Sequence, residues 1–297
     1  MKPLRAIVPT LLFSLTIWPA LAQAPPPPPT LPPPQLDQLV ARIGLYPDPL
    51  LAQVLAAATY PDQIPAAAQW ADQHHYLTGQ ALAAAIQGDQ VPWDPSVQSL
   101  LPFPSVLDMM ASDMGWTQQL GNAFLVQQQD VMDAVQRQRA LASRYGYLRT
   151  NPQIVVSAGP YITIMPVNPA FIVVPAYDPA IVFFAPRPGF VVGGAIHFGF
   201  GITIGTFFRP WGWGVGLSLF DWGRHTVVIN NAPWGRTWVN HVAYVHPYPA
   251  VRRLAPAARS GGAAPRPVEQ HQLRERSPAE RESARRGERP REEHERR

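Results

Sequence analysis

The sequence contains no cysteine and only one lysine, Lys2. The lack of cysteine excludes a disulfide framework, a thiol nucleophile, cysteine metal ligands and an acylated cysteine that would tether the chain to a membrane. Stability therefore has to come from the burial of apolar side chains. The 297 residues are enough for one large domain or two small ones.

Glutamate is absent before Glu269, so the acidic residues of most of the chain are aspartates. Between Asp37 and Asp133 there are ten aspartates and one basic residue, Arg42. From Arg252 to the end there are thirteen arginines and eight glutamates. The net charge of +4 therefore describes the C-terminal tail rather than a basic fold, and the composition gives no reason to expect nucleic-acid binding.

The first residues predict a cleaved secretory signal peptide over residues 1–22. Lys2 and Arg5 supply a positive start, an apolar run extends from Ala6 to Leu21, and Ala20-Leu21-Ala22 has the small residues of a cleavage site. A membrane anchor is the alternative, but a spanning helix needs about 20 mostly apolar residues and this run is shorter. We expect the mature protein to work in the periplasm or cell envelope.

Residues 23–35 are rich in proline and predict an extended spacer of polyproline II type. Residues 36–148 form an acidic region with helical spacing of apolar residues. Asp48-Pro49 and Asp94-Pro95 predict helix starts with aspartate caps, Ser105 predicts another cap, and the longest helix is expected from Trp116 to Arg144. Gly146 is predicted to end this helix, because glycine is common directly after a helix C-terminus.

Residues 149–248 predict a β-rich region with many glycines and aromatic residues. Short runs of β-branched and aromatic residues lie between prolines, at residues 154–156, 161–164, 171–174 and 181–184, and later at 225–230 and 237–245. The uncharged stretch 189–208 favours strands weakened by glycine, with a segment that contacts a membrane as the alternative. Residues 249–297 predict a disordered arginine- and glutamate-rich tail. The expected fold class is α+β.

Residues 45–61 read Leu-Tyr-Pro-Asp-Pro-Leu-Leu-Ala-Gln-Val-Leu-Ala-Ala-Ala-Thr-Tyr-Pro, followed later by Trp-Asp-Pro-Ser-Val at 93–97 and Val-Pro-Ala-Tyr-Asp-Pro at 174–179. In these motifs the chain resembles a family of exported bacterial proteins known as domain of unknown function 3300. The resemblance implies export and a helical part followed by strands. It implies no reaction, ligand or catalytic residue.

Catalytic and metal-binding groups are sparse in the sequence. No serine lies in a Gly-x-Ser-x-Gly elbow and no phosphate-binding glycine loop is present. Asp108 with Asp113, or Asp130 with Asp133, offer pairs of carboxylates for acid–base chemistry, with capping and solvated roles as the alternative. His74 and His75 diverge on a helix, and His241 and His246 lack further ligands, so we expect neither a metal nor another cofactor.

Aromatic residues provide the better functional hypothesis. They are Trp211, Trp213, Trp222, Trp234, Trp238, Tyr244 and Tyr248. Flat rings on strands can stack on sugars or lie at a membrane interface, and the alternative is a small β core built from large side chains. We take the first six as a candidate interaction surface for membrane, envelope glycan or envelope protein. The sequence thus predicts a non-enzymatic interaction or structural module, with an envelope hydrolase using aspartate and histidine as the alternative.

Overall fold

The computed structural model describes residues 26–189, 192–199, 201–245 and 248. They belong to a compact unit, Met1–Val251, and the second unit, Arg252–Arg297, lies outside the described residues. The expected signal peptide, the tail from residue 249 and His246 also lie outside them.

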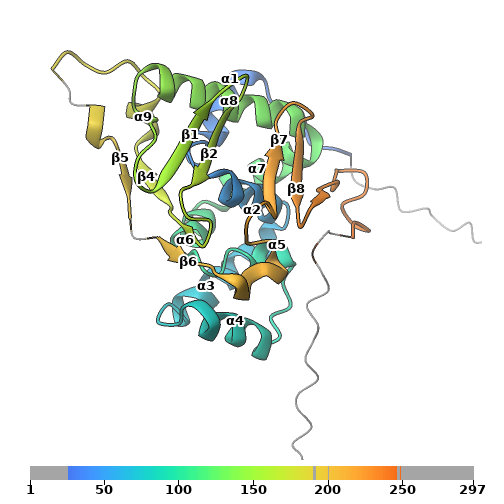
Figure 1. The fold of residues 1–297 in the computed structure, drawn as a ribbon. Coiled ribbons are helices and arrows are strands. Elements are labelled where there is room, and N and C mark those ends of the chain that lie inside the picture. The colour runs from blue at the N-terminus through green and yellow to red at the C-terminus, as the bar shows by residue number, and fades with distance from the viewer. Residues whose placement is uncertain (1–25, 190–191, 200, 246–247, 249–297) are drawn as a thin grey trace, which may run out of the picture. The chain divides into compact units, whose positions relative to one another are not determined.

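Helices occupy the N-terminal half and small antiparallel sheets follow, which confirms the α+β class (Figure 1). The helices are α1 (Pro33–Val40), α2 (Asp48–Ala58), α3 (Ile64–Gln73), α4 (Gly79–Gly88), α5 (Pro95–Gln98), α6 (Pro104–Ser112), α7 (Met114–Val126), α8 (Gln128–Arg144) and α9 (Pro179–Val182), with 3-10 turns η1 (Pro61–Gln63), η2 (Val192–Gly194) and η3 (Thr206–Trp211). The strands are β1 (Ile154–Ala158), β2 (Ile162–Pro166), β3 (Phe171–Ile172), β4 (Pro175–Tyr177), β5 (Ile196–Phe198), β6 (Ile202–Thr203), β7 (Ser218–Asp221), β8 (Thr226–Ile229) and β9 (Ala232–Pro233).

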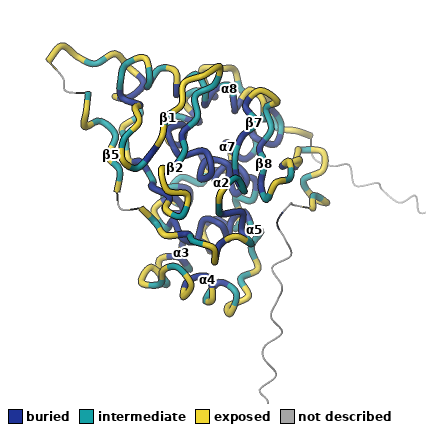
Figure 2. The backbone as a smooth tube through the Cα atoms, in the orientation of Figure 1, coloured by how far each residue is buried: buried dark blue, intermediate teal, exposed yellow. Residues whose placement is uncertain are grey.

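Helix α2 lies at the centre of the core. All of its residues are buried, and it contacts α5, α7, β2 and β7 (Figure 2). Pro49 in its first turn suits a helix start, and leucine, valine and alanine cover almost every side of the helix. A helix that is apolar all round is expected to be surrounded by protein. The motif at residues 45–61 is therefore the sequence of the central helix and its flanks.

Helices α2 and α7 approach each other closely at Gly121. A Cβ atom at Gly121 would lie 2.0 Å from the carbonyl oxygen of Ala58. This distance is shorter than any tolerable contact, so only glycine permits this crossing. Gly121 thereby sets the position of α7 against the central helix.

Four antiparallel sheets follow the helices, with strand orders β1-β2, β3-β6, β4-β5 and β7-β8-β9. In the β1-β2 hairpin Val156 pairs with Ile164, and in the three-stranded sheet Phe220 pairs with Val227. The larger hydrophobic cluster contains side chains from α1 to α8 together with Trp211, Trp213 and Val227. The helical and β-rich regions therefore share one core.

The expected helix from Trp116 to Arg144 is interrupted, and this prediction was wrong in one respect. Helix α7 ends at Val126, Gln127 adopts φ −140° and ψ 52°, and α8 begins at Gln128. The Gln127 side chain accepts a hydrogen bond from Leu31 N (2.7 Å) and donates one to Leu31 O (3.1 Å). The break thus binds the proline-rich segment. The predicted extended spacer of residues 23–35 is wrong at its end, because helix α1 already begins at Pro33.

Three further local predictions were wrong. Residues 181–184 do not form a strand, because Asp178 accepts a hydrogen bond from Ala180 N and starts the short helix α9. Residues 237–245 form no strand, and residues 238–243 form turns. Ser105 caps no helix, since the cap position of α6 is Phe103. Helix α4 was not predicted.

The described residues of the stretch 189–208 contain the short strands β5 and β6, the 3-10 turn η2 and the start of η3. Among the described residues, no helix has the length and apolar character needed to cross a membrane.

Candidate interaction surface

Four of the six proposed surface aromatics are buried. Trp211 and Trp213 are inaccessible to solvent, and Trp222 and Trp234 are nearly so. All four belong to the main hydrophobic cluster. They therefore cannot stack on a ligand at the surface, and for these residues the alternative of a core built from large side chains is correct.

The buried indoles are held by hydrogen bonds to the helices. Trp211 donates to Gln98 Oε1 (2.8 Å), Trp213 to Ser99 O (2.9 Å) and Trp222 to Asp48 Oδ2 (3.2 Å). The indole nitrogen of Trp234 has no hydrogen-bond partner among the described residues. These bonds fix the glycine-rich region against α2 and α5.

Gln53, in the middle of α2, uses both ends of its amide in the core. Its Nε2 donates to Trp211 O (3.0 Å) and to Ser218 Oγ (2.9 Å). Its Oε1 accepts from Ser99 Oγ (2.9 Å) and from Tyr248 OH (2.5 Å). Gln53 is fully buried, so these four bonds compensate for the loss of water at the amide.

Asp48 and Arg139 form a buried ion pair between α2 and α8. Arg139 Nη1 lies 2.6 Å from Asp48 Oδ1, and the guanidinium also donates to the carbonyl oxygens of Gly44, Tyr46 and Ile162. Asp48 was expected to cap α2, but the cap position is Pro47 and the Asp48 carboxylate faces Arg139 instead.

The exposed apolar part of the aromatic region is a turn, residues 237–245, which we call the valine turn. Val239, Val242 and Val245 expose 95%, 89% and 87% of their surface. These are the most exposed large apolar side chains among the described residues. The valines are three residues apart, whereas strand alternation would separate them by two. This spacing was the available signal in the sequence, and it was missed because the segment was interpreted as a strand.

Hydrogen bonds hold the valine turn in one conformation. Asn240 accepts from Thr237 N (2.7 Å) through its side-chain oxygen and donates to Gly235 O (2.8 Å). Trp238 N donates to Leu125 O at the end of α7 (3.0 Å). Tyr244 OH accepts from Gly235 N (2.9 Å). The turn is therefore attached to the helical part at its start and closed on itself by side chains.

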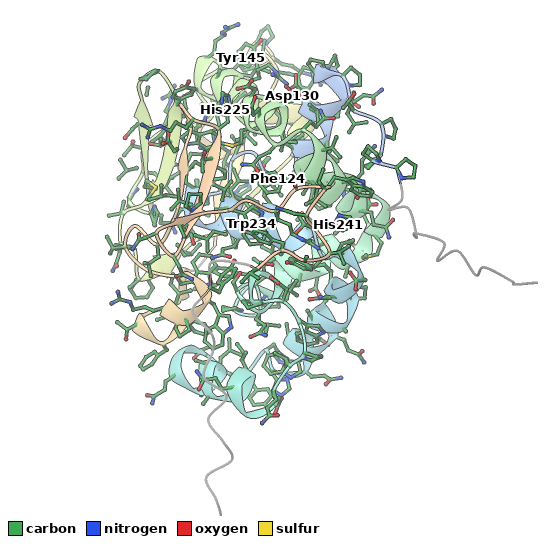
Figure 3. All side chains as sticks on the ribbon, turned by 90° about the vertical axis from the view of Figure 1, so that its right-hand side faces the viewer. Phe124, Asp130, Tyr145, His225, Trp234 and His241 are labelled. Atoms are coloured by element: carbon green, nitrogen blue, oxygen red, sulfur yellow. The ribbon has the colours of Figure 1, made fainter. Side chains whose placement is uncertain are left out.

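Trp238 and Tyr244, the remaining two proposed surface residues, are half-buried members of the valine turn. The Trp238 ring packs against His241 with ring centroids 4.9 Å apart, and Tyr244 packs edge-on against Trp234 at 5.0 Å. Figure 3 labels His241 of this turn and Trp234, which precedes it in the chain. The exposed apolar side chains of this segment are thus valines rather than indoles.

Arg236 connects the valine turn to the end of α2. Its guanidinium donates to Thr59 O and Thr59 Oγ1 and lies over the Tyr60 ring, 3.7 Å from the centroid. Its Nη2 donates to His241 O (3.0 Å). Burial lowers the pKa of Arg236, and the neighbouring Tyr60 and Asp94 oppose this effect. Burial, followed by the nearby charge of Asp94, raises the pKa of Tyr60.

The aspartates proposed for catalysis have separate positions and roles. Asp108 and Asp130 are exposed. Asp113 caps α7 by accepting from Trp116 N (3.0 Å) and pairs with Arg42 at 3.0 Å. These two partners lower the pKa of Asp113. Asp133 lies 2.9 Å from His225 Nε2.

Two clefts are lined by other residues. One of about 360 Å³ lies beside His74 and His75 at the end of α3 and includes Thr78 and Thr203. Another of about 460 Å³ is lined by Tyr147, Ile181, Phe184 and Arg187. His74 stacks on Trp70 with ring centroids 3.9 Å apart, and its Nδ1 donates to Trp70 O (2.8 Å). No group of three or more histidine, aspartate or glutamate side chains suited to a metal ion occurs within the described ranges.

Comparison with known proteins identifies a family and a relative. The family model described as "Protein of unknown function (DUF3300)" matches residues 33–246. A protein from Escherichia coli (strain K12), described as "Uncharacterized protein YacH", is 38% identical over 182 residues, which cover 50% of this chain and 29% of that protein. The chain therefore spans less than a third of this relative. No solved structure matches.

Proposed function

Because the chain belongs to the DUF3300 family, whose description assigns no activity, we propose its function from its own residues. We propose that it is an exported protein of the cell envelope that docks on another envelope component and catalyses no reaction. The valine turn is the docking element. It includes the half-buried Trp238 and Tyr244.

The observation that carries this proposal is the exposure of Val239, Val242 and Val245 in a turn that hydrogen bonds hold in place. Single exposed apolar residues are common, but clusters of them indicate interaction sites. Full burial of a valine contributes about 1.5–3 kcal/mol, so three valines supply about 4.5–9 kcal/mol before the costs of association. A preorganised turn reduces those costs because little conformational freedom is lost on docking.

Export is supported by the sequence of residues 1–22, with its positive start, apolar run and small-residue site. The lack of cysteine gives such a protein no acylated cysteine for attachment. Attachment to the envelope then depends on non-covalent surfaces. A membrane, an envelope glycan and an envelope protein are the three kinds of component that an apolar turn with aromatic neighbours suits.

The proposal is tested by fractionating bacterial cells that express the full chain. We expect the protein in the envelope fraction, and the variant Val239→Ser/Val242→Ser/Val245→Ser in the soluble fraction. The matched control is Val155→Ser/Val167→Ser/Val215→Ser, which changes three other exposed valines and should stay with the envelope. Equal urea midpoints for the two triple variants would show that docking, not folding, differs.

Two results would contradict the proposal. The first is a wild-type protein found wholly in the soluble fraction or retained in the cytoplasm. The second is a valine-turn variant that fractionates like the wild type.

A further inference from the structure

The cleft of about 460 Å³ shares no residue with the valine turn and has a structure of its own. One wall is Tyr147, which follows α8, and the other is the segment from α9 to Arg187. Tyr147 and Val182 belong to one hydrophobic cluster, so the two walls are packed together inside the protein. The volume lies within the range of about 300–1,000 Å³ that is typical of small-molecule sites.

One wall of the cleft exposes large apolar side chains. Phe184 and Ile181 expose 62% and 38% of their surface, and both border the cleft together with Ala180 and Ala185. A ligand with an apolar body would remove these surfaces and its own from water at the same time. The wall therefore favours an apolar ligand body.

The polar side chains of the cleft are two hydrogen-bond donors without partners. Tyr147 exposes only 8% of its surface, and its hydroxyl makes no hydrogen bond to a described residue. Arg187 is exposed and has neither a hydrogen bond nor an ion pair within the described ranges. A guanidinium matches the planar shape of a carboxylate, and a phenol can donate to the same group. The two side chains therefore favour a carboxylate.

The surrounding charge also favours an anion. Asp178, whose carboxylate starts α9, is the only acidic residue between positions 134 and 220. Arg144 ends α8, and Arg149 turns back toward this end, because a Cβ at Gly146 would lie 2.6 Å from Arg149 Nη2. Neither arginine forms an ion pair with another described residue. The neighbourhood of the cleft thus has an excess of positive charge.

From these features we propose that the cleft binds a medium-chain fatty acid. Its carboxylate accepts a hydrogen bond from Tyr147 and pairs with Arg187, and its aliphatic chain packs against Phe184 and Ile181. A peptide fits less well, because its backbone groups also need partners when they leave water. The side chains that line the cleft offer only one hydroxyl and one guanidinium.

The test is isothermal titration calorimetry of the full chain with hexanoate, octanoate and decanoate, each below the concentration at which it forms micelles. A buried CH2 group raises affinity about three- to fourfold, so each extension by two carbons should tighten binding about tenfold. Octanoate should bind at least about tenfold tighter than octan-1-ol, which lacks the charge, and than octylammonium, whose charge is opposite. Salt should weaken octanoate binding, because Arg187 is exposed.

Three variants separate the carboxylate end of the cleft from its apolar wall. Arg187→Gln should lower the affinity for octanoate about tenfold and leave the affinity for octan-1-ol unchanged. Tyr147→Phe keeps the ring in the core and should lower the affinity for octanoate about three- to tenfold. Phe184→Ser should lower the affinity for both ligands about fivefold.

Matched controls come from outside the cleft. Arg209 is an exposed arginine without an ion pair in the described part of the chain, and Phe207 is another exposed phenylalanine. Arg209→Gln and Phe207→Ser should bind octanoate and octan-1-ol like the wild type. Urea midpoints of all five variants show whether each one folds.

Several outcomes overturn the proposal. They are no binding of decanoate, equal binding of octanoate and octylammonium, affinity that does not rise with chain length, and an Arg187→Gln variant that matches Arg209→Gln. Tighter binding of acetyl-trileucine than of decanoate would instead assign the cleft to a peptide C-terminus. The triple variant of the valine turn should bind octanoate like the wild type, so this site and the docking function can fail separately.

Discussion

Asp48 and Arg139 face each other at 2.6 Å in the interior and join the start of α2 to the middle of α8. Both side chains are buried and have almost no contact with water. The Asp48 carboxylate also accepts from Ile164 N (3.3 Å) and Trp222 Nε1 (3.2 Å), so strand β2 and the loop after β7 depend on the same group. The pair therefore orients three segments, α8, β2 and the loop after β7, around the central helix.

Removing one member of this pair should destabilise the protein strongly. Asp48→Asn leaves the Arg139 guanidinium buried without its counter-charge, and we expect a loss of about 3–5 kcal/mol in the free energy of unfolding. Arg139→Met should lose a comparable amount. In urea denaturation, the double variant should lose clearly less than the sum of the single variants. Strict additivity would show that the two charges do not interact.

Gln53 offers a second test of the buried polar network. Gln53→Leu removes the amide that donates to Trp211 O and to Ser218 Oγ in the core, and we expect a loss of about 2–4 kcal/mol. Gln118 lies exposed on α7, and Gln118→Leu should change stability by less than about 0.5 kcal/mol. A Gln53→Leu variant as stable as the Gln118→Leu control would contradict this role.

The crossing of α2 and α7 predicts opposite effects for two glycines of the same helix. Gly121→Ala places a Cβ against Ala58 O and should lower the free energy of unfolding by about 1–3 kcal/mol. Gly115 lies in the first turn of α7 with its nearest atom, Asp113 Oδ1, at 3.7 Å. Gly115→Ala should stabilise the protein by up to about 1 kcal/mol because alanine favours helix. Thermal unfolding of the two variants measures the difference.

Tyr46 predicts a loss of stability at alkaline pH. Burial raises its pKa to about 12, whereas a tyrosine in the unfolded chain titrates near 10. The folded state therefore holds its proton longer, and stability falls as the pH rises from about 10 to 12, by about 2–3 kcal/mol. Urea midpoints across this range should show the fall, and Tyr46→Phe should reduce it. An identical pH profile for Tyr46→Phe would assign the fall to other groups.

Asp113 predicts an effect of the opposite sign in acid. The hydrogen bond from Trp116 N and the ion pair with Arg42 hold its pKa below the usual value. Its contribution to stability is therefore present at neutral pH and is lost as the pH falls through the folded-state pKa. An NMR titration of the Asp113 carboxyl should give a low pKa, and Arg42→Gln should bring it closer to the ordinary value.

The sequence predicted those features that depend on local chemistry. Asp94 caps α5 by accepting from Ser96 N (2.9 Å), and Gly146 ends α8 with φ of +78°. Both follow from side-chain and backbone preferences within a few residues. The α+β class followed in the same way from the change in apolar spacing after residue 150.

Features that depend on distant contacts were not predictable from local pattern. Gln127 is an ordinary helical residue, and the helix breaks there because its side chain binds Leu31, which lies 96 positions away. Asp178-Pro179 starts a helix although it suited a strand turn equally well. Four tryptophans that we expected at the surface are buried, because their indoles pack against α2 and α5. The three most exposed apolar side chains of this region are valines.

The bonds between Gln127 and Leu31 also have a mechanical consequence. A proline-rich chain is stiff, and here its last residues before α1 are fixed at both backbone polar groups of Leu31. The two hydrogen bonds therefore restrict rotation of the proline-rich segment at Leu31. The junction of α7 and α8 sets the direction of the proline-rich segment. A mechanical force that pulls on this segment is therefore transmitted directly to α7 and α8.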